Sequence, residues 1–300
     1  MNSSVNSITI KSTYIDFKAI TKAGLAVSVV FSSMAGFLLG VPDILSLDWL
    51  ILLKLAIGGY CMVGASNAYN QVIEKDLDAL MDRTKNRPVP AGRMSPNIAL
   101  IIASILTAVG IALLYNINPK TAMFGAISIF LYTSVYTPLK TVTSLSVFVG
   151  AIPGAIPFML GWVAATGNFG IEAGTLFLIQ FFWQFPHFWA IGWFLFEDYE
   201  KAGFFMLPTG KKDNGTALQI ILYTLWLIIA SLLPSLGYTG QLFISPIAAV
   251  LVFLLGIWML FYAVKLYKSR TAKVARSLML VSVSYITFLQ LIYIFDKILR

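Results

Sequence analysis

The sequence predicts an all-α, polytopic membrane protein with about nine transmembrane helices, on three observations. First, 58% of the 300 residues are hydrophobic and only 11% are charged, whereas soluble domains carry about 25% charged residues. Second, apolar runs about 20 residues long, the length that spans a bilayer, recur along the whole chain. Third, the basic residues gather in alternate loops between these runs.

The apolar runs set the number and order of the predicted helices. They cover residues 20–41, 48–69, 97–116, 119–137, 144–165, 173–196, 215–236, 241–266 and 276–296. Backbone groups inside a bilayer must be hydrogen-bonded within the protein, so each run is expected to be helical. Ser95 followed by Pro96 is a favourable helix start and places the beginning of the third helix there.

The distribution of Lys and Arg predicts the orientation of the chain. If the N-terminus is cytoplasmic, all but four of the 21 basic residues lie in or beside cytoplasmic loops; the others are Lys54, Lys120, Lys297 and Arg300. We therefore interpret the net charge of +8 as an orientation signal and not as a nucleic-acid-binding surface. The expected location is a cell membrane, in the simplest case the bacterial plasma membrane.

The chain is expected to form one membrane domain. Residues 1–19 are polar and lack the pattern of a cleaved signal peptide, and residues 20–300 form the transmembrane domain. Long polar loops at about 70–96 and 197–214 follow the second and sixth helices, which suggests two parallel four-helix repeats and a ninth helix. Cys61 is the only cysteine, so no intrachain disulfide can form.

The first long loop continues the second helix with a row of polar side chains. Asn70, Glu74 and Asp78 are four residues apart and would lie on one helix face. Their amide and carboxylate oxygens are the ligands that Mg²⁺ prefers, and substrate phosphates commonly complete its coordination. The row predicts a Mg²⁺ site at the cytoplasmic side of the membrane.

Basic residues follow this row within a short stretch: Arg83, Lys85, Arg87 and Arg93. Carboxylates alone would repel a diphosphate, whereas a bridging Mg²⁺ and nearby guanidinium groups would attract it. The alternative is an ordinary charged loop. An orientation signal needs only basic residues, however, so acids on one helix face favour a diphosphate site.

The sixth helix carries a second polar group and the only histidine. Glu197 and Asp198 reach the same membrane side as the first cluster and could hold a second Mg²⁺ or the far side of the diphosphate; the alternative is a plain helix end. His187 lies about three turns deeper. Ionisable groups within membranes tend to face functional cavities, and imidazole can ligate iron or relay a proton. Packing against a neighbouring helix is the alternative.

A motif in the first loop resembles the first signature of the intramembrane prenyltransferases of the UbiA type. It consists of Asn70, Glu74, Asp78, Arg83, Thr84, Arg87 and Pro88. The segments RTKNRPVPAGRMSP, YTPLK around Lys140 and QFPHFW around His187 are more narrowly similar to the protohaem IX farnesyltransferases. The resemblance covers the hydrophobic chain and implies a prenyltransferase domain of nine helices around a central cavity. It also implies farnesyl diphosphate as donor, Mg²⁺ as cofactor and the vinyl group of haem B as acceptor.

The resemblance assigns roles to the polar residues. The expected catalytic residues are Asn70, Glu74, Asp78, Arg83 and Arg87. The expected substrate-binding residues are Lys85, Arg93, Lys140, His187, Glu197 and Asp198. The expected Mg²⁺ ligands are Asn70, Glu74, Asp78 and Asp198. The expected partners are farnesyl diphosphate, haem B and the lipid bilayer, with a haem A synthase acting downstream.

Two departures from the family pattern bear on the acceptor. Glu74 stands where many UbiA-type enzymes have aspartate, and its carboxylate still permits Mg²⁺ ligation. His187 stands where relatives that prenylate aromatic acids have an aspartate, which argues against a symmetrical two-metal site. The nearest alternative, prenylation of an aromatic or quinone precursor, is therefore disfavoured. A transporter would place its ionisable groups near the midplane, whereas most acids here lie at one interface.

Overall fold

The computed structural model describes residues 13–44 and 47–300, and within them the chain forms helices and no strand. The long helices are α2 (Ala23–Gly40), α3 (Trp49–Ile73), α5 (Pro96–Tyr115), α6 (Pro119–Phe130), α8 (Ser146–Thr166), α9 (Ile171–Phe194), α11 (Asn214–Leu232), α12 (Pro246–Ser269) and α13 (Ala272–Leu299). The short elements are α4 (Lys75–Leu80), the π-helix η1 (Leu131–Tyr136), α7 (Thr137–Leu139), α10 (Phe196–Lys201) and the 3₁₀-helix η2 (Leu233–Leu236). The prediction of an all-α protein is confirmed.

Helix length and hydropathy identify a multi-pass membrane protein. Eight helical segments of the described chain are long and apolar enough to cross a bilayer, and one of them runs without interruption from α6 through η1 to α7. The 24-residue helix α9 is not among the eight, but it packs against α8, α11 and α13. Counting α9 with them agrees with the prediction of about nine helices. Residues 1–12 of the predicted polar segment lie outside the described residues.

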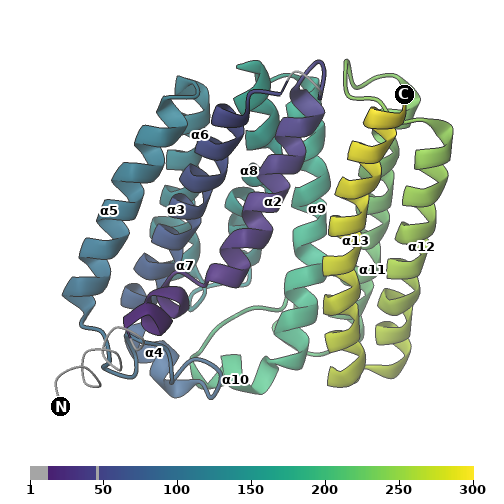
Figure 1. Cartoon of the computed structure of the whole chain (residues 1–300). Helices are drawn as coiled ribbons and strands as arrows, with labels where there is room; N and C mark the ends of the chain where they lie inside the picture. The colour runs from purple at the N-terminus through teal and green to yellow at the C-terminus, as the bar shows by residue number, and fades with distance from the viewer. Residues whose placement is uncertain (1–12, 45–46) are drawn as a thin grey trace, which may run out of the picture.

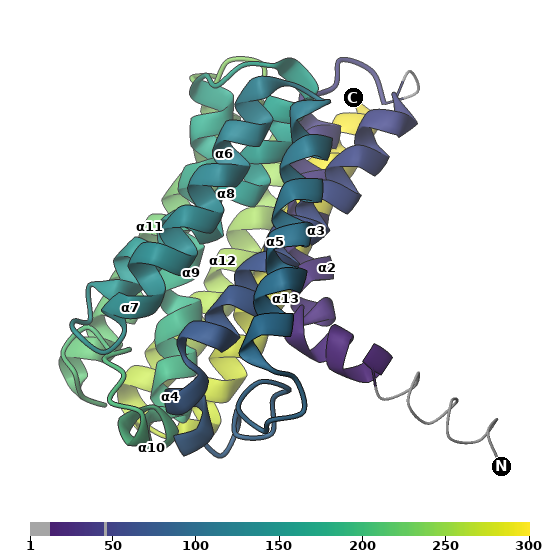
Figure 2. The same ribbon diagram turned by 90° about the vertical axis from the view of Figure 1, so that its left-hand side faces the viewer.

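The long helices form a closed ring in chain order. Each packs on the next, and α2 closes the ring between α13 and α3 (Figures 1 and 2). The most extensive contacts across the ring run from α2 to α8 and from α9 to α13. Each helix therefore finds partners for its packed face, while the outer faces carry exposed apolar side chains that suit lipid. The predicted four-helix repeat stays a prediction.

The crossing of α2 and α8 depends on glycine. A β-carbon on Gly36 of α2 would collide with the carbonyl of Phe158, and one on Gly161 of α8 would collide with the carbonyl of Ser33. Small residues let two membrane helices approach until their backbones touch. The close α2–α8 contact therefore joins two helices that are not neighbours in the ring.

The polar loops collect at one end of the ring. The short helices α4 and α10 lie there, and the C-terminus lies at the opposite end (Figure 1). Ser95 Oγ accepts a hydrogen bond from the Ile98 N–H at 3.3 Å, which confirms the predicted start of the third long helix. We call the end that contains α4 and α10 the polar end.

Candidate active site

The predicted row of polar side chains lies where α3 passes into α4 at the polar end. α3 ends at Ile73, and Glu74 departs from helical geometry with φ −95° and ψ 13° before α4 begins. Asn70, Glu74 and Asp78 are exposed to only 2%, 3% and 0%. Buried carboxylates are costly unless they are paired, so their partners determine what the row can do.

Each buried carboxylate is paired with a cation from another part of the chain. Lys140 Nζ lies 2.8 Å from Glu74 Oε1, and Arg87 Nη1 lies 2.6 Å from Asp78 Oδ2. The Thr84 hydroxyl donates to the Asp78 carbonyl oxygen at 2.8 Å. Charge-assisted hydrogen bonds of this kind are about twice as strong as neutral ones. The structure thus brings acids and bases of the predicted site into direct contact.

The π-helix η1 and the short α7 position Lys140. π-Helical segments are rare and often occur at functional sites. Lys140 Nζ lies 4.6 Å from the ring centroid of Tyr136 and 5.5 Å from that of Phe204. Asn70 Nδ2 donates to Thr137 Oγ1 at 3.3 Å, which ties the end of α3 to α7. Sequence reasoning named Lys140 but missed these three neighbours, two of which lie in the YTPLK segment.

Lys22 is a further site residue that sequence reasoning missed. It precedes α2 with a φ of 46°, in the left-handed region that lysine rarely adopts. Burial first, and then the positive charges of Arg87 and Lys140, lower the pKa of Lys22 to about 7. Lys22 and Arg83 add to the cations already paired with Glu74 and Asp78, so basic groups outnumber acids. This excess favours an anionic ligand.

Binding of inorganic diphosphate at about pH 8 is expected to be accompanied by proton uptake. An anion beside Lys22 stabilises the charged ammonium, so its pKa rises from about 7 and the group takes up a proton on binding. Calorimetry in buffers of different ionisation enthalpy measures this uptake. The Lys22→Met variant should take up fewer protons than the wild type, and equal uptake would contradict the assignment.

α10 is bound to the first polar loop. Asp198 Oδ1 accepts from the Asp82 N–H at 2.7 Å, and Asp198 Oδ2 accepts from the Arg83 N–H at 3.2 Å. Asp82 is also paired with Lys201 at 2.5 Å and with Lys85 at 2.6 Å. Asp198, a predicted Mg²⁺ ligand, instead joins the two polar loops in this structure.

Two other predicted substrate-binding residues have partners of their own. Glu197 is paired with Lys212, and the hydrogen bond from that ammonium lowers the pKa of the Glu197 carboxyl. Arg93 Nη2 lies 3.0 Å from Asp16 Oδ1, which connects the loop to the helical residues 13–20. In the structure both residues form ion pairs that connect loop segments. Their contact with a substrate stays a prediction.

The residues beside Asp78 fit a Mg²⁺ ion. Asp78 Oδ1 is buried and has no hydrogen-bond partner, which is an unfavourable state for a carboxylate oxygen that a metal ion would relieve. Among the described residues, no three His, Cys, Asp or Glu side chains gather around one point. The predicted ligands Asn70, Glu74, Asp78 and Asp198 include three acids, and these three acids do not gather around one point in the described structure. The Asn70 amide oxygen and substrate phosphates would complete the coordination.

Comparison with known proteins identifies the family. The UbiA prenyltransferase family matches residues 29–291. The chain belongs to the UbiA prenyltransferase family. A protoheme IX farnesyltransferase of Flavobacterium johnsoniae is 77% identical over 300 residues, which cover 100% of both chains. That of Cytophaga hutchinsonii is 40% identical over 282 residues, covering 93% of this chain and 96% of the relative.

Solved structures share the UbiA fold. A digeranylgeranylglyceryl phosphate synthase superposes with a TM-score of 0.79 at 16% identity, covering 96% of this chain and 100% of the other. A UbiA homologue of Archaeoglobus fulgidus bound to GPP and Mg²⁺ superposes with a TM-score of 0.68 at 13% identity, covering 93% and 99%. At these identities the likeness establishes the fold alone.

The hydrogen bonds of His187 define which ring nitrogen is free. His187 Nδ1 lies 2.8 Å from Ser282 Oγ on α13, and that hydroxyl donates to the Met279 carbonyl oxygen at 2.7 Å. With its single proton directed to the Met279 carbonyl oxygen, the hydroxyl oxygen accepts from the Nδ1–H tautomer of His187. Nε2 is then unprotonated and has a free lone pair. Sequence reasoning missed Ser282, since it lies on another helix.

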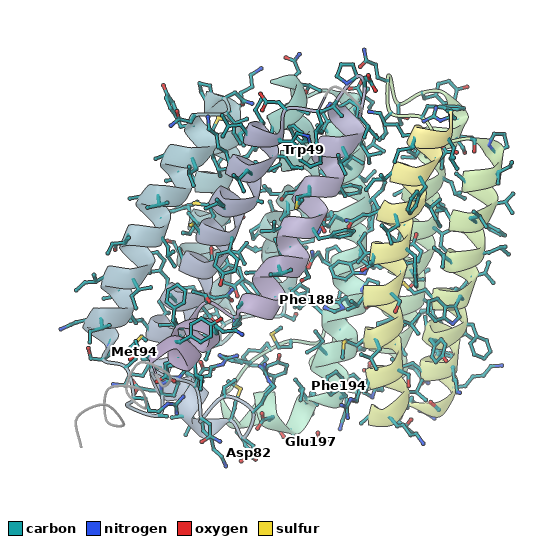
Figure 3. All side chains as sticks on the ribbon, in the orientation of Figure 1. Trp49, Asp82, Met94, Phe188, Phe194 and Glu197 are labelled. Atoms are coloured by element: carbon teal, nitrogen blue, oxygen red, sulfur yellow. The ribbon has the colours of Figure 1, made fainter. Side chains whose placement is uncertain are left out.

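Aromatic side chains surround the half-buried His187. Its ring stacks on Trp183, with centroids 4.5 Å apart and an interplanar angle of 18°, and lies 5.6 Å from Phe188. Phe188, Phe194 and Glu197 follow one another along α9 and α10 toward the polar end (Figure 3). The UbiA-family bundle thus offers a flat apolar surface and a nitrogen lone pair on the helix that leads to the polar end.

Proposed function

We propose that this chain is a haem O synthase, which transfers the farnesyl group of farnesyl diphosphate to the vinyl group of haem B. The observation that carries the proposal is full-length identity of 77% to a protoheme IX farnesyltransferase. The polar end adds independent support, because a buried row of acids paired with basic side chains suits a metal-bound diphosphate.

The donor diphosphate is proposed to bind between α3, α4 and α7. Lys140 and Arg87 would exchange part of their bonding with Glu74 and Asp78 for the diphosphate oxygens. Arg83 is proposed to contact the same group. Mg²⁺, when bound by Asn70, Glu74 and Asp78, would neutralise charge on the diphosphate. These basic side chains then stabilise the negative charge that develops on the leaving group, which is where such groups contribute most to catalysis.

The proposed reaction is an alkylation led by ionisation. The bond between farnesyl C1 and the diphosphate oxygen breaks, and the diphosphate takes the electron pair. The vinyl carbon of haem B then forms the new carbon–carbon bond. Water captures the resulting cation and loses one proton, which gives a hydroxyethylfarnesyl side chain. The apolar bundle protects the first cation from premature capture by water.

The acceptor is proposed to lie beside His187. The Nε2 lone pair could ligate haem iron, and Trp183 and Phe188 could pack on the porphyrin face. Neither an imidazole nor an indole helps a diphosphate to leave. His187 is therefore assigned to the acceptor and not to the donor.

The polar end is proposed to face the cytoplasm of a bacterial cell, because it contains most of the Lys and Arg residues. A haem A synthase is the proposed enzyme that uses the product. Single cysteines at Pro90 and Asn168, in a Cys61→Ala background, test the orientation. A membrane-impermeant maleimide should label residue 90 only from the cytoplasmic side and residue 168 only from outside. The opposite labelling would overturn the orientation.

Product identification tests the proposed function. Purified protein in lipid nanodiscs is supplied with farnesyl diphosphate, Mg²⁺ and either haem B or 4-hydroxybenzoate. The products are separated by chromatography, and their masses are determined by mass spectrometry. We expect a farnesylated haem and no farnesylated phenol. A prenylated phenol together with unchanged haem B would contradict the proposal.

A further inference from the structure

A cavity of about 40 Å³ lies among α2, α3, α5, α6 and α8, deeper in the bundle than the row of acids. On α3 it is lined by Gly59, Met62, Val63 and Ser66. Gly59, Met62, Ser66 and Asn70 follow one another at three- or four-residue spacing, so they share one face of the helix. The cavity therefore continues the line of the proposed diphosphate site into the membrane.

We propose that this cavity holds the third isoprene unit of the donor and so selects farnesyl diphosphate over shorter and longer chains. The inference rests on the proposed function. The polar site cannot distinguish donors of different chain length, because the diphosphate is identical in all prenyl donors. Selection of chain length requires a surface that touches the distal end of the chain.

Length is the first support for this placement. At a rise of about 1.5 Å per residue, α3 carries Ser66 and Gly59 to about 6 Å and about 17 Å beyond Asn70. A chain of carbon atoms advances about 1.25 Å per bond when extended, by the geometry of ~1.5 Å carbon–carbon bonds, so the third unit of farnesyl begins roughly 10 Å from C1 and ends roughly 14 Å from it. The cavity spans this interval.

Volume and lining are the second support. One water needs about 10–15 Å³ of cavity volume measured in this way, so the cavity has room for about three waters, which approaches the size of one five-carbon unit. Ile129, Ile156 and Leu160 contribute apolar walls. An apolar chain end gains from leaving water for such a surface. A geranyl chain would stop short and leave the cavity unfilled.

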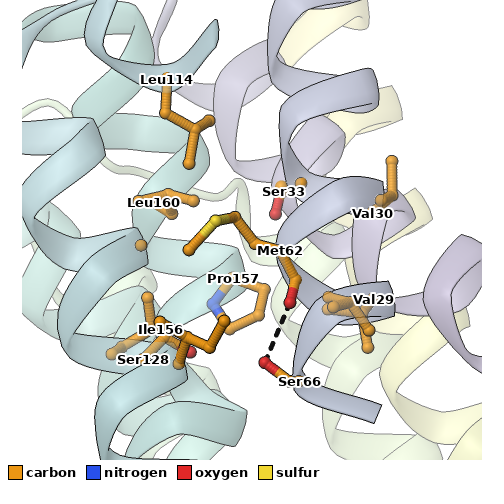
Figure 4. A pocket seen from close by; sticks show the side chains of 14 residues that line it. Val29, Val30, Ser33, Met62, Ser66, Leu114, Ser128, Ile156, Pro157 and Leu160 are labelled. Atoms are coloured by element: carbon orange, nitrogen blue, oxygen red, sulfur yellow. Dashed lines mark hydrogen bonds between the residues drawn. The ribbon is translucent and has the colours of Figure 1, made fainter. Parts of the chain in front are cut away.

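Tightly packed side chains bound the cavity on the side of Gly110 and Gly125. Met62 Sδ would lie 2.8 Å from a β-carbon placed on Gly110, and Leu114 Cδ1 would lie 2.8 Å from one on Gly125. Both side chains thus already fill the space that these glycines leave. Met62 lies between Leu114 and Ser66 in the cavity (Figure 4). A fourth isoprene unit would have to displace Met62 or Leu114 from a close-packed interior.

Donor preference of three variants tests the proposal. Nanodisc-embedded protein is supplied with haem B, Mg²⁺ and geranyl, farnesyl or geranylgeranyl diphosphate, and kcat/KM is measured for each donor. The wild type should prefer farnesyl. Met62→Ala should raise the geranylgeranyl-to-farnesyl ratio roughly tenfold. Gly59→Leu should raise the geranyl-to-farnesyl ratio by a similar factor, because its β-carbon meets only Val30 at 3.5 Å and the rest fills the cavity.

The control is Met159→Ala, which removes the same atoms from a buried methionine of α8 that does not line the cavity. It should keep the wild-type ratios. If no donor is transferred to haem B by the wild type, the proposed function fails. If the wild type prefers farnesyl but Met62→Ala and Gly59→Leu keep its ratios, or Met159→Ala shifts them equally, this inference alone is overturned. Gly59→Ala, whose β-carbon also fits, replaces Gly59→Leu if the leucine variant does not fold.

Discussion

Replacing Asp78 by asparagine is expected to reduce turnover about a thousandfold while the protein still folds. The amide keeps the shape of the side chain but removes the charge that Arg87 contacts and that a Mg²⁺ ion would need. Loss of one such interaction at a group where charge develops costs about 4 kcal/mol of transition-state stabilisation, which is roughly a factor of 10³ in rate. The rate of haem farnesylation with saturating substrates measures the loss.

Asp76→Asn is the matched control for Asp78→Asn. The Asp76 side chain is 93% exposed and lies 3.9 Å from Lys75, so it makes only a weak surface ion pair. This variant should keep nearly the full rate. Equal losses in the two variants would contradict the special role of Asp78, as would full activity of Asp78→Asn in the presence of a metal chelator.

The His187→Ala variant is expected to bind haem B more than about tenfold more weakly and to bind farnesyl diphosphate as tightly as the wild type. The variant loses the Nε2 lone pair and the ring that stacks on Trp183. Loss of one ligand worth at least about 1.4 kcal/mol weakens binding tenfold. Titration of haem, followed by the Soret band, and of a non-hydrolysable farnesyl diphosphate analogue measures both affinities.

Two comparisons make the His187 experiment decisive. Asp78→Asn should show the reverse pattern, with weaker donor binding and normal haem binding. Ser282→Ala removes the acceptor that orients Nδ1–H, and loss of such an orienting bond costs about 10–100-fold where the histidine ligates a metal. If His187→Ala weakened both ligands equally, the residue would be a packing element of α9 and not an acceptor site.

The helices were predictable because the length of an apolar run and the charge of a loop are local properties of the sequence. The sixth helix was expected at residues 173–196, and α9 is observed at Ile171–Phe194. The polar row was predictable for the same reason. Asn70, Glu74 and Asp78 are four residues apart, so their common burial where α3 passes into α4 depends on the spacing within one segment.

The partners of the row depend on how distant segments pack, and the sequence does not record that directly. Lys140 meets Glu74 across 66 residues, and Asp198 meets the backbone of Asp82 across 116 residues. The π-helix that turns Tyr136 toward Lys140 has no recognised local signal. Lys22 could not be selected among 21 basic residues until α2 was seen to begin beside the acids.

The most direct test of the proposed reaction is the mass of the haem product formed in ¹⁸O-labelled water. Transfer to the vinyl group followed by capture of the cation by water places one solvent oxygen in the new side chain. We expect a product heavier than haem B by one farnesyl group and one hydroxyl group, with the label in that hydroxyl. A product without solvent oxygen, or haem B recovered unchanged while farnesyl diphosphate is consumed, would contradict the account.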